Sequence, residues 1–257
     1  MTPEAPRNTA SARFECKYLV SDHRAEAIRR WAQAWVEPDP HAADLPGHAY
    51  IVSSVYLDSV DLALYRETLE GNCDREKLRV RSYPSVKLGK DVPVFLEVKR
   101  RRNRVVEKVR ASVDSAFAKA LLSGEEVTVR QPDVAEFVAI KQRRGLGPVV
   151  RVDYNRQAYV GAFGDGARLT LDRALRGSLP SDLWVRGGGW LVEDRSVILE
   201  LKFNGALPGW MQQLVRRFDL DRRSYSKYAT TLAKGQVRAG TVGDLLTHMP
   251  KRRATGA

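Results

Sequence analysis

The sequence has little cysteine and histidine, the residues that form the disulfides of small secreted domains and bind soft metals. Its 257 residues include two cysteines, Cys16 and Cys73, and four histidines. Neither cysteine has the spacing of a metal-ligand pair or a redox motif, and no histidine has a partner at metal-binding spacing. These absences argue against a disulfide scaffold, a thiolate metal site and a thiol redox centre. They indicate a reducing compartment, and we expect the cytoplasm.

Long apolar runs are also missing. None approaches the ~20 residues that a membrane-spanning helix needs, and the opening MTPEAPRNTASA lacks the apolar core of a signal peptide. We predict a disordered leader over residues 1–11 and a disordered basic tail over 249–257. No internal repeat and no Pro/Gly/Ser linker divides the remainder, so residues 12–248 are predicted to form a single domain.

Acidic residues are too few to balance the basic ones. The chain has 43 Lys and Arg against 31 Asp and Glu, a formal net charge of +12. Such an excess favours a polyanionic partner: nucleic acid, an anionic membrane, a nucleotide or an inorganic phosphate chain. The basic segments contain no nucleic-acid reading motif and no interleaved aromatic platform, which argues against nucleic acid.

What the sequence has in abundance is alternation of charged and apolar residues. In REKLRVRSY, the charged Lys77, Arg79 and Arg81 fall on one face of a predicted strand, and Leu78 and Val80 on the other. Four amphipathic helical segments lie between strand-like segments and two more follow the last strand, which indicates an α+β fold with a mostly antiparallel sheet. The predicted strands are Ala12–Leu19, Ala49–Leu57, Arg75–Tyr83, Val92–Arg101, Val105–Val113, Val149–Tyr159, Ala167–Leu175, Leu183–Val192 and Ser196–Phe203.

At least six of these strands have a charged face backed by an apolar one. Helices can cover the apolar faces if these point outward, and the charged faces then line an interior. We therefore predict a closed antiparallel β-barrel, a tunnel of about eight strands with a basic lumen and helices outside. The charge of the inward arginines would have to be balanced by water and bound anions. A few acidic residues on the same faces would pair with these cations or hold a divalent metal. They are Glu15, Asp58, Glu97, Asp172 and Glu200.

Nine short motifs then occur in a familiar order: RFECKYLV, YLDS, KLRVRSY, FLEVKRR, VVEKVR, DYNRQAY, RLTLD, VILELKF and SYSKY. In this order, from about Ala12 to Ala233, the chain resembles the polyphosphate polymerase (VTC catalytic) domain of the triphosphate tunnel metalloenzymes. The resemblance implies transfer of the γ-phosphoryl group of ATP to a growing polyphosphate chain, release of ADP, and Mn²⁺ or Mg²⁺ as cofactor. A membrane-protein partner, if the protein has one, would be encoded separately.

The resemblance also implies roles for individual residues. Glu200 would ligate the metal, and Lys227 would close one end of the tunnel and touch the product. Phosphate-gripping catalytic residues would be Arg79, Arg81, Lys99, Lys108, Arg156 and Arg168. Further substrate or product contacts would come from Arg13, Lys17, Lys77 and Lys202.

Two positions depart from related patterns. Hydrolases of the superfamily open with E-x-E-x-K, whereas Arg13 stands at the first carboxylate here, which fits the polymerase branch. The polymerases have a basic residue three positions before Lys227, and this chain has Ser224 there, with Arg222 or Arg223 as substitutes. Two alternatives stay open: a hydrolase of triphosphates or tripolyphosphate with the same fold, and a non-catalytic module that binds polyphosphate.

Overall fold

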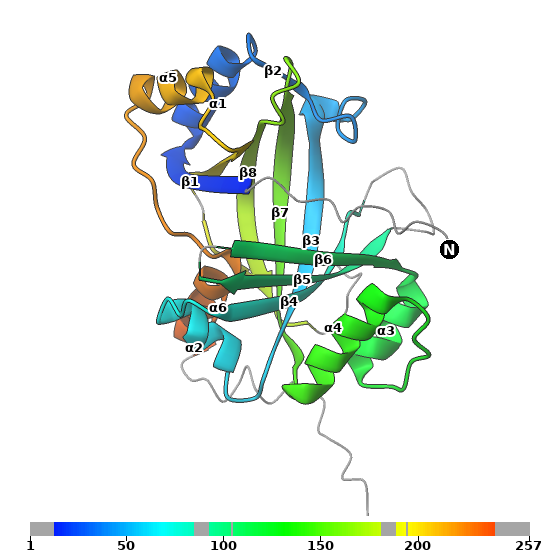
Figure 1. Ribbon diagram of the computed structural model, residues 1–257. Helices are drawn as coiled ribbons and strands as arrows, with labels where there is room; N and C mark the ends of the chain where they lie inside the picture. The colour runs from blue at the N-terminus through cyan, green and yellow to red at the C-terminus, as the bar shows by residue number, and fades with distance from the viewer. Residues whose placement is uncertain (1–12, 85–92, 104, 181–188, 194, 240–257) are drawn as a thin grey trace, which may run out of the picture. The chain divides into compact units, whose positions relative to one another are not determined.

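The computed structural model describes residues 13–84, 93–103, 105–180, 189–193 and 195–239, and its helices and strands form an α+β fold (Figure 1). The predicted leader and tail lie outside these residues. No helix in the described ranges is long and apolar enough to cross a membrane.

Most strands begin and end within a few residues of the predicted bounds. The described strands are β1 (Arg13–Ser21), β2 (Val36–Pro38), β3 (Ala49–Asp58), β4 (Arg75–Ser82), β5 (Val94–Arg102), β6 (Val105–Val113), β7 (Gly147–Gly161), β8 (Arg168–Ser178), β9 (Trp190–Leu191) and β10 (Ser196–Asn204). The short β2 has no alternating pattern and was missed. Most of the predicted strand Leu183–Val192 lies outside the described residues, and β9 is its described end.

The helices occur at the six predicted segments: α1 (Asp22–Ala32), α2 (Ala63–Leu69), α3 (Ser115–Ser123), α4 (Pro132–Arg143), α5 (Gly209–Arg217) and α6 (Lys227–Ala239). Local signals explain several ends. The Ser21 hydroxyl accepts a hydrogen bond from the Arg24 amide at the start of α1, and Asp114 does the same for Phe117 in α3. Gly124 ends α3 in the left-handed conformation that glycine adopts without strain.

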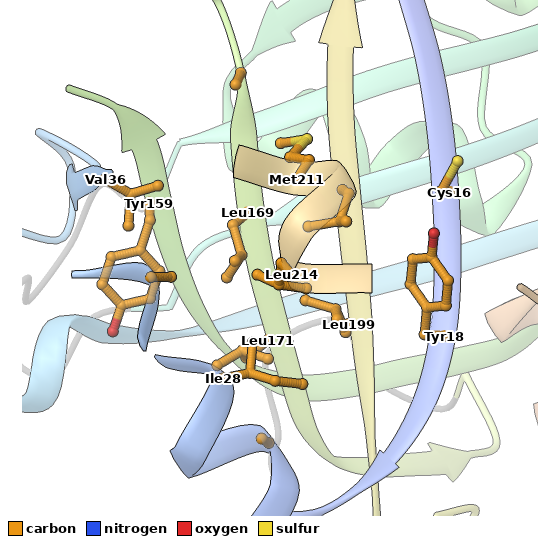
Figure 2. Close-up of a cluster of buried hydrophobic side chains, with 14 of the residues drawn as sticks. Cys16, Tyr18, Ile28, Val36, Tyr159, Leu169, Leu171, Leu199, Met211 and Leu214 are labelled. Atoms are coloured by element: carbon orange, nitrogen blue, oxygen red, sulfur yellow. The ribbon is translucent and has the colours of Figure 1, made fainter. Parts of the chain in front are cut away.

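The chain forms two compact units, each with its own apolar core. The first unit comprises the described parts of 1–49, 157–172 and 195–224. Its core joins one face of β1, β8 and β10 to α1 and α5, and Figure 2 shows Tyr18, Leu169 and Leu199 from the strands beside Ile28 and Leu214 from the helices. The alternation along these strands therefore turns the apolar residues toward the helices, as the sequence predicts.

The second unit comprises the described parts of 50–156, 173–194 and 225–257. Its core joins the apolar face of β3–β6 to α2, α3 and α4, with Leu78, Val80 and Leu96 packed against Leu121 and Phe137. All five side chains are at most 2% exposed. Because the helices cover this face, the charged residues of the same strands lie on the opposite face.

The predicted closed barrel is not observed. Hydrogen bonding orders the strands β1-β10-β8-β7-β3-β4-β5-β6, with β2 added to β7 and β9 to β8, and within the described ranges no pairing joins β1 to β6. The pairings β1–β10, β10–β8, β3–β4, β4–β5 and β5–β6 are antiparallel, as predicted. Alternation defines which face is apolar, and it cannot define whether the two outermost strands meet. The edge strand β6 has exposed charged side chains, a common protection of open edges.

Candidate functional site

The polar face of β3–β6 in the second unit carries a dense group of cations around one buried carboxylate. Glu97 of β5 lies between Arg79 of β4 and Arg110 of β6 in the register of the sheet. Its side chain is 1% exposed, although carboxylates are seldom fully buried unless they are paired. The residue is therefore held by its neighbours.

Four cationic side chains contact Glu97. The Arg79 Nε and Lys108 Nζ atoms lie 2.6 and 2.8 Å from its carboxylate oxygens. The Arg81 and Arg110 Nε atoms lie 3.8 and 3.6 Å away. Antiparallel pairing places these residues on three adjacent strands at or near one register position, which is why they converge. We call Arg79, Arg81, Lys108 and Arg110 the cation cluster.

The cation cluster controls the protonation of Glu97. Burial alone would raise the pKa of this carboxyl, but the positive charges of Arg79, Arg81 and Lys108 outweigh burial and lower it well below its usual range. Glu97 is thus ionised at any physiological pH. One negative charge facing four positive charges leaves a strong positive excess, which a bound anion would reduce.

Aromatic hydroxyls and further cations surround the cluster. Arg79 Nη1 donates to the Tyr56 hydroxyl at 3.0 Å, and Arg81 Nη2 lies 3.5 Å from the Tyr154 hydroxyl. The Tyr154 ring is 5.2 Å from the Arg156 guanidinium and 5.0 Å from the Lys227 ammonium, both within cation–π range. Burial favours the neutral Tyr56 phenol, but Arg79 and Arg81 prevail and lower its pKa.

A second buried carboxylate anchors helix α6 beside these groups. Asp58, at the end of β3, accepts a 2.5 Å hydrogen bond from the Tyr228 hydroxyl and further bonds from the Leu64 and Tyr65 amides of α2. Tyr228 also stacks on Tyr56, with ring centroids 5.0 Å apart. Lys227 is the adjacent residue, so this anchor holds the backbone that carries it.

The first unit has a separate polar face, on β1, β8 and β10. Here Glu200 is the central carboxylate: Lys202 Nζ lies 2.7 Å and Lys17 Nζ 3.9 Å from its oxygens, and Lys17 also contacts Glu15 at 3.4 Å. Thr170 is the register partner of Glu200 on β8, and its buried hydroxyl has no hydrogen-bond partner in the described structure.

These residues offer a limited donor set for a divalent cation. Glu200 is 5% exposed, and the Thr170 hydroxyl beside it in the sheet is a buried oxygen with no hydrogen-bond partner among the described residues. In the described ranges no three Asp, Glu, His or Cys side chains gather as a metal cage. Mg²⁺ commonly binds through one or two carboxylates together with substrate phosphates and water. The set fits a cation that the substrate helps to hold, and not an all-protein site.

The predicted site residues fall into two groups, one in each compact unit. Arg79, Arg81 and Lys108 share Glu97, while Arg156 and Lys227 share Tyr154. Lys77 Nζ contacts the Ser226 hydroxyl at 2.8 Å, and Lys99 is exposed next to Lys77 and Lys108 in the sheet. The predicted residues of the first unit are Lys17, Lys202, Glu200, Arg168, whose Nη1 lies 3.9 Å from Asp39, and Arg13, which begins β1.

Sequence reasoning missed several contributors. Arg110 shares the charged face of β6 with Lys108 and was passed over. Tyr56 and Tyr154 sit at strand positions where aromatic residues usually indicate core, and only the tertiary contacts show that their hydroxyls meet arginines. The central position of Glu97 follows from cross-strand register, although its place on a cationic strand face was a usable signal.

Comparison with known proteins complements this geometry. The family model described as the VTC domain matches residues 12–235. No curated protein matches the chain. Solved structures that resemble it include the PH1819 protein of Pyrococcus horikoshii OT3, at 14% identity and a TM-score of 0.48, with 87% of this chain and 99% of that chain covered.

Another is a Bacillus halodurans protein described as a "putative adenylate cyclase", at 14% identity and a TM-score of 0.50, with 84% of this chain and 94% of that chain covered. At this identity the second likeness indicates a shared fold and says nothing about activity.

Proposed function

The chain belongs to the VTC domain family, and from this premise we propose that it is a polyphosphate polymerase. It would transfer the γ-phosphoryl group of ATP to the end of a polyphosphate chain and release ADP. A terminal phosphate oxygen of the acceptor forms a bond to the γ-phosphorus, and the bond between that phosphorus and the β-phosphate oxygen breaks.

The observation that carries the proposal is the cation cluster around Glu97. Arginine guanidinium groups bind phosphate oxygens through paired hydrogen bonds and keep their charge when buried. Phosphoryl transfer needs mainly positioning and neutralisation of developing negative charge. The cation cluster has one carboxylate for four cations, and two of these cations are shielded from water: Arg81 is 7% exposed and Arg79 is 21% exposed. This excess of positive charge suits a triphosphate better than a neutral substrate.

Glu97 has a positioning role in this proposal. Because it accepts a hydrogen bond from Arg79 and forms an ion pair with Lys108, it fixes two of the cations before the substrate arrives, so that less side-chain entropy is lost on binding. In the first unit, Glu200 would hold the divalent metal, Mn²⁺ or Mg²⁺, whose contribution is to neutralise phosphate charge. Arg156 and Lys227 on Tyr154 supply further cations for a polyanion.

The small number of carboxylates favours polymerase over hydrolase. A hydrolase must order and activate a water molecule, usually through a carboxylate or a metal cage. The carboxylate at the centre of the cation cluster, Glu97, is already engaged by cations. The nearby Asp58 is already engaged by the Tyr228 hydroxyl and by two amides of α2. An anionic acceptor, in contrast, needs the cations that these strands supply.

The test is product analysis. Purified protein with ATP and Mn²⁺ should yield ADP and a phosphate polymer visible on a gel, with little free phosphate. Arg79→Ala should abolish polymer formation, whereas Arg143→Ala, an exposed arginine on α4, should leave it unchanged. Stoichiometric free phosphate without polymer would instead support the hydrolase, and no turnover of ATP would support a binding module.

A further inference from the structure

The charged face of the second unit continues outward from the cation cluster toward the hairpin between β5 and β6. Lys99 follows Glu97 by two residues on the same face of β5. It lies directly opposite Lys77 of β4 and Lys108 of β6. Two residues further, Arg75 lies opposite Arg101. We call Arg75 and Arg101 the outer pair.

Like charges placed directly opposite one another destabilise a sheet. The effect is visible at Arg75, whose pKa is lowered by burial and by the positive charge of Arg101. The hydrogen bonds of the outer pair go to backbone carbonyls, from Arg75 to Asn72 at 2.6 Å and from Arg101 to Asn103 at 2.8 Å. The Asp74 carboxylate of the same region accepts from the Asn103 amide at 3.2 Å. An arrangement that works against folding suggests an anionic ligand.

We infer that the outer pair is a second binding site for inorganic polyphosphate, reached by chains that extend beyond the cation cluster. This inference rests on the proposed function, because the chain must start at the cluster. From Glu97 to Arg101 the strand advances four residues, about 14 Å at ~3.4 Å per residue. Chains shorter than this span cannot touch both sites, so the outer pair selects for long acceptors and holds the growing product.

Polyphosphate is favoured over a membrane surface. Val105 and Val106 at the hairpin are 60% and 49% exposed, and a membrane-binding hairpin would use such residues beside its cations. Two valines, however, bury little apolar area, and interfacial segments usually present Trp, Phe or Leu. The row of lysines between the two sites also makes the positive face continuous, as a linear polyanion requires.

Adjacent arginines provide a matched test. Arg101 and Arg102 are both exposed on β5, but alternation places them on opposite faces. Binding of inorganic tripolyphosphate and of long-chain polyphosphate is measured by calorimetry without ATP, so that turnover is not required. Arg101→Ser should weaken long-chain binding about two- to five-fold, the strength of an exposed ion pair. It should leave tripolyphosphate binding unchanged, and Arg102→Ser should leave both unchanged.

Other results would overturn the inference. If Arg101→Ser and the parent bind long chains with equal affinity, the outer pair is not a binding site, and the proposed polymerase activity is unaffected. Equal losses in Arg101→Ser and Arg102→Ser would show a non-specific charge effect. Loss of binding to vesicles of anionic lipid, with long-chain polyphosphate binding retained, would assign the hairpin to a membrane. Absence of any polyphosphate binding by the parent would overturn both the outer site and the proposed function.

Discussion

Replacing Glu97 by glutamine should destabilise the protein in a way that a bound polyanion repairs. The amide keeps the shape of the side chain but removes the negative charge, and its NH₂ group donates toward cations that are themselves donors. Arg81, 7% exposed, and Arg79, 21% exposed, would then be buried beside Lys108 without a counter-charge. Polyphosphate oxygens would supply the missing charge.

The expected loss can be sized from burial. Removing one partner of a fully buried ion pair costs about 3–5 kcal/mol. Lys108 and Arg110 are 44% and 37% exposed in their side chains, so water already screens part of the repulsion. We therefore expect about 2–3 kcal/mol, which corresponds to a decrease in Tm of about 4–12 °C for a chain of this size.

Thermal unfolding with and without tripolyphosphate measures both effects. A ligand at about 100 times its Kd stabilises the native state by about 2.7 kcal/mol, enough to offset the loss in Glu97→Gln. A matched control is Glu76→Gln: Glu76 is 17% exposed, and its oxygens lie 2.6 Å from Arg100 Nε and 3.6 Å from Arg144 Nη1. This carboxylate lies outside the cation cluster, so tripolyphosphate should raise the Tm of Glu76→Gln only as much as it raises the Tm of the parent. The increase in Glu97→Gln should be larger, because the ligand there also replaces a missing charge.

Two outcomes would refute this reasoning. An unchanged Tm in Glu97→Gln would show that water or other groups already satisfy the cations. A lowered Tm with the same ligand-induced increase as in Glu76→Gln would show that the polyanion does not take the place of the Glu97 charge.

Arg79→Ala should weaken tripolyphosphate binding at least about tenfold, because a bidentate phosphate contact is lost. The Tm should change little, because Glu97 keeps three cations. A large decrease in Tm at unchanged affinity would show that Arg79 has a structural role. Glu200→Gln should remove most of the Mn²⁺ dependence of turnover, and a Mn²⁺ titration that matches the parent would leave Glu200 as the ion-pair partner of Lys17 and Lys202. Tyr228→Phe should raise the KM for polyphosphate, because α6 loses its anchor on Asp58 and Lys227 shifts; an unchanged KM would show that the stack on Tyr56 suffices. The stability that Glu97 contributes should be full above its unfolded-state pKa of about 4.3 and be lost as the pH falls below that value, so acid denaturation of Glu97→Gln should show a shallower slope in this range.

The sequence determined the elements and their faces well. Period-two alternation in REKLRVRSY placed Leu78 and Val80 in the core and Arg79 and Arg81 on the polar face, because a strand can bury an apolar side only by exposing the other. Capping residues such as Ser21 and Asp114 indicated helix starts through local hydrogen bonds. Family membership was likewise predicted, since nine motifs in order carry more information than any one of them.

Only the tertiary structure decided which residues meet. Glu97 was one of five acidic residues on polar faces, and it became the centre of the cation cluster because three strands pair in a register that brings Arg79 and Arg110 opposite it. The contact between Tyr228 and Asp58 joins residues far apart in the chain. Closure of the barrel was predicted and not found, because alternation is identical in a closed wall and in an open sheet. Local sequence defines faces, whereas register and edge pairing depend on contacts between distant segments.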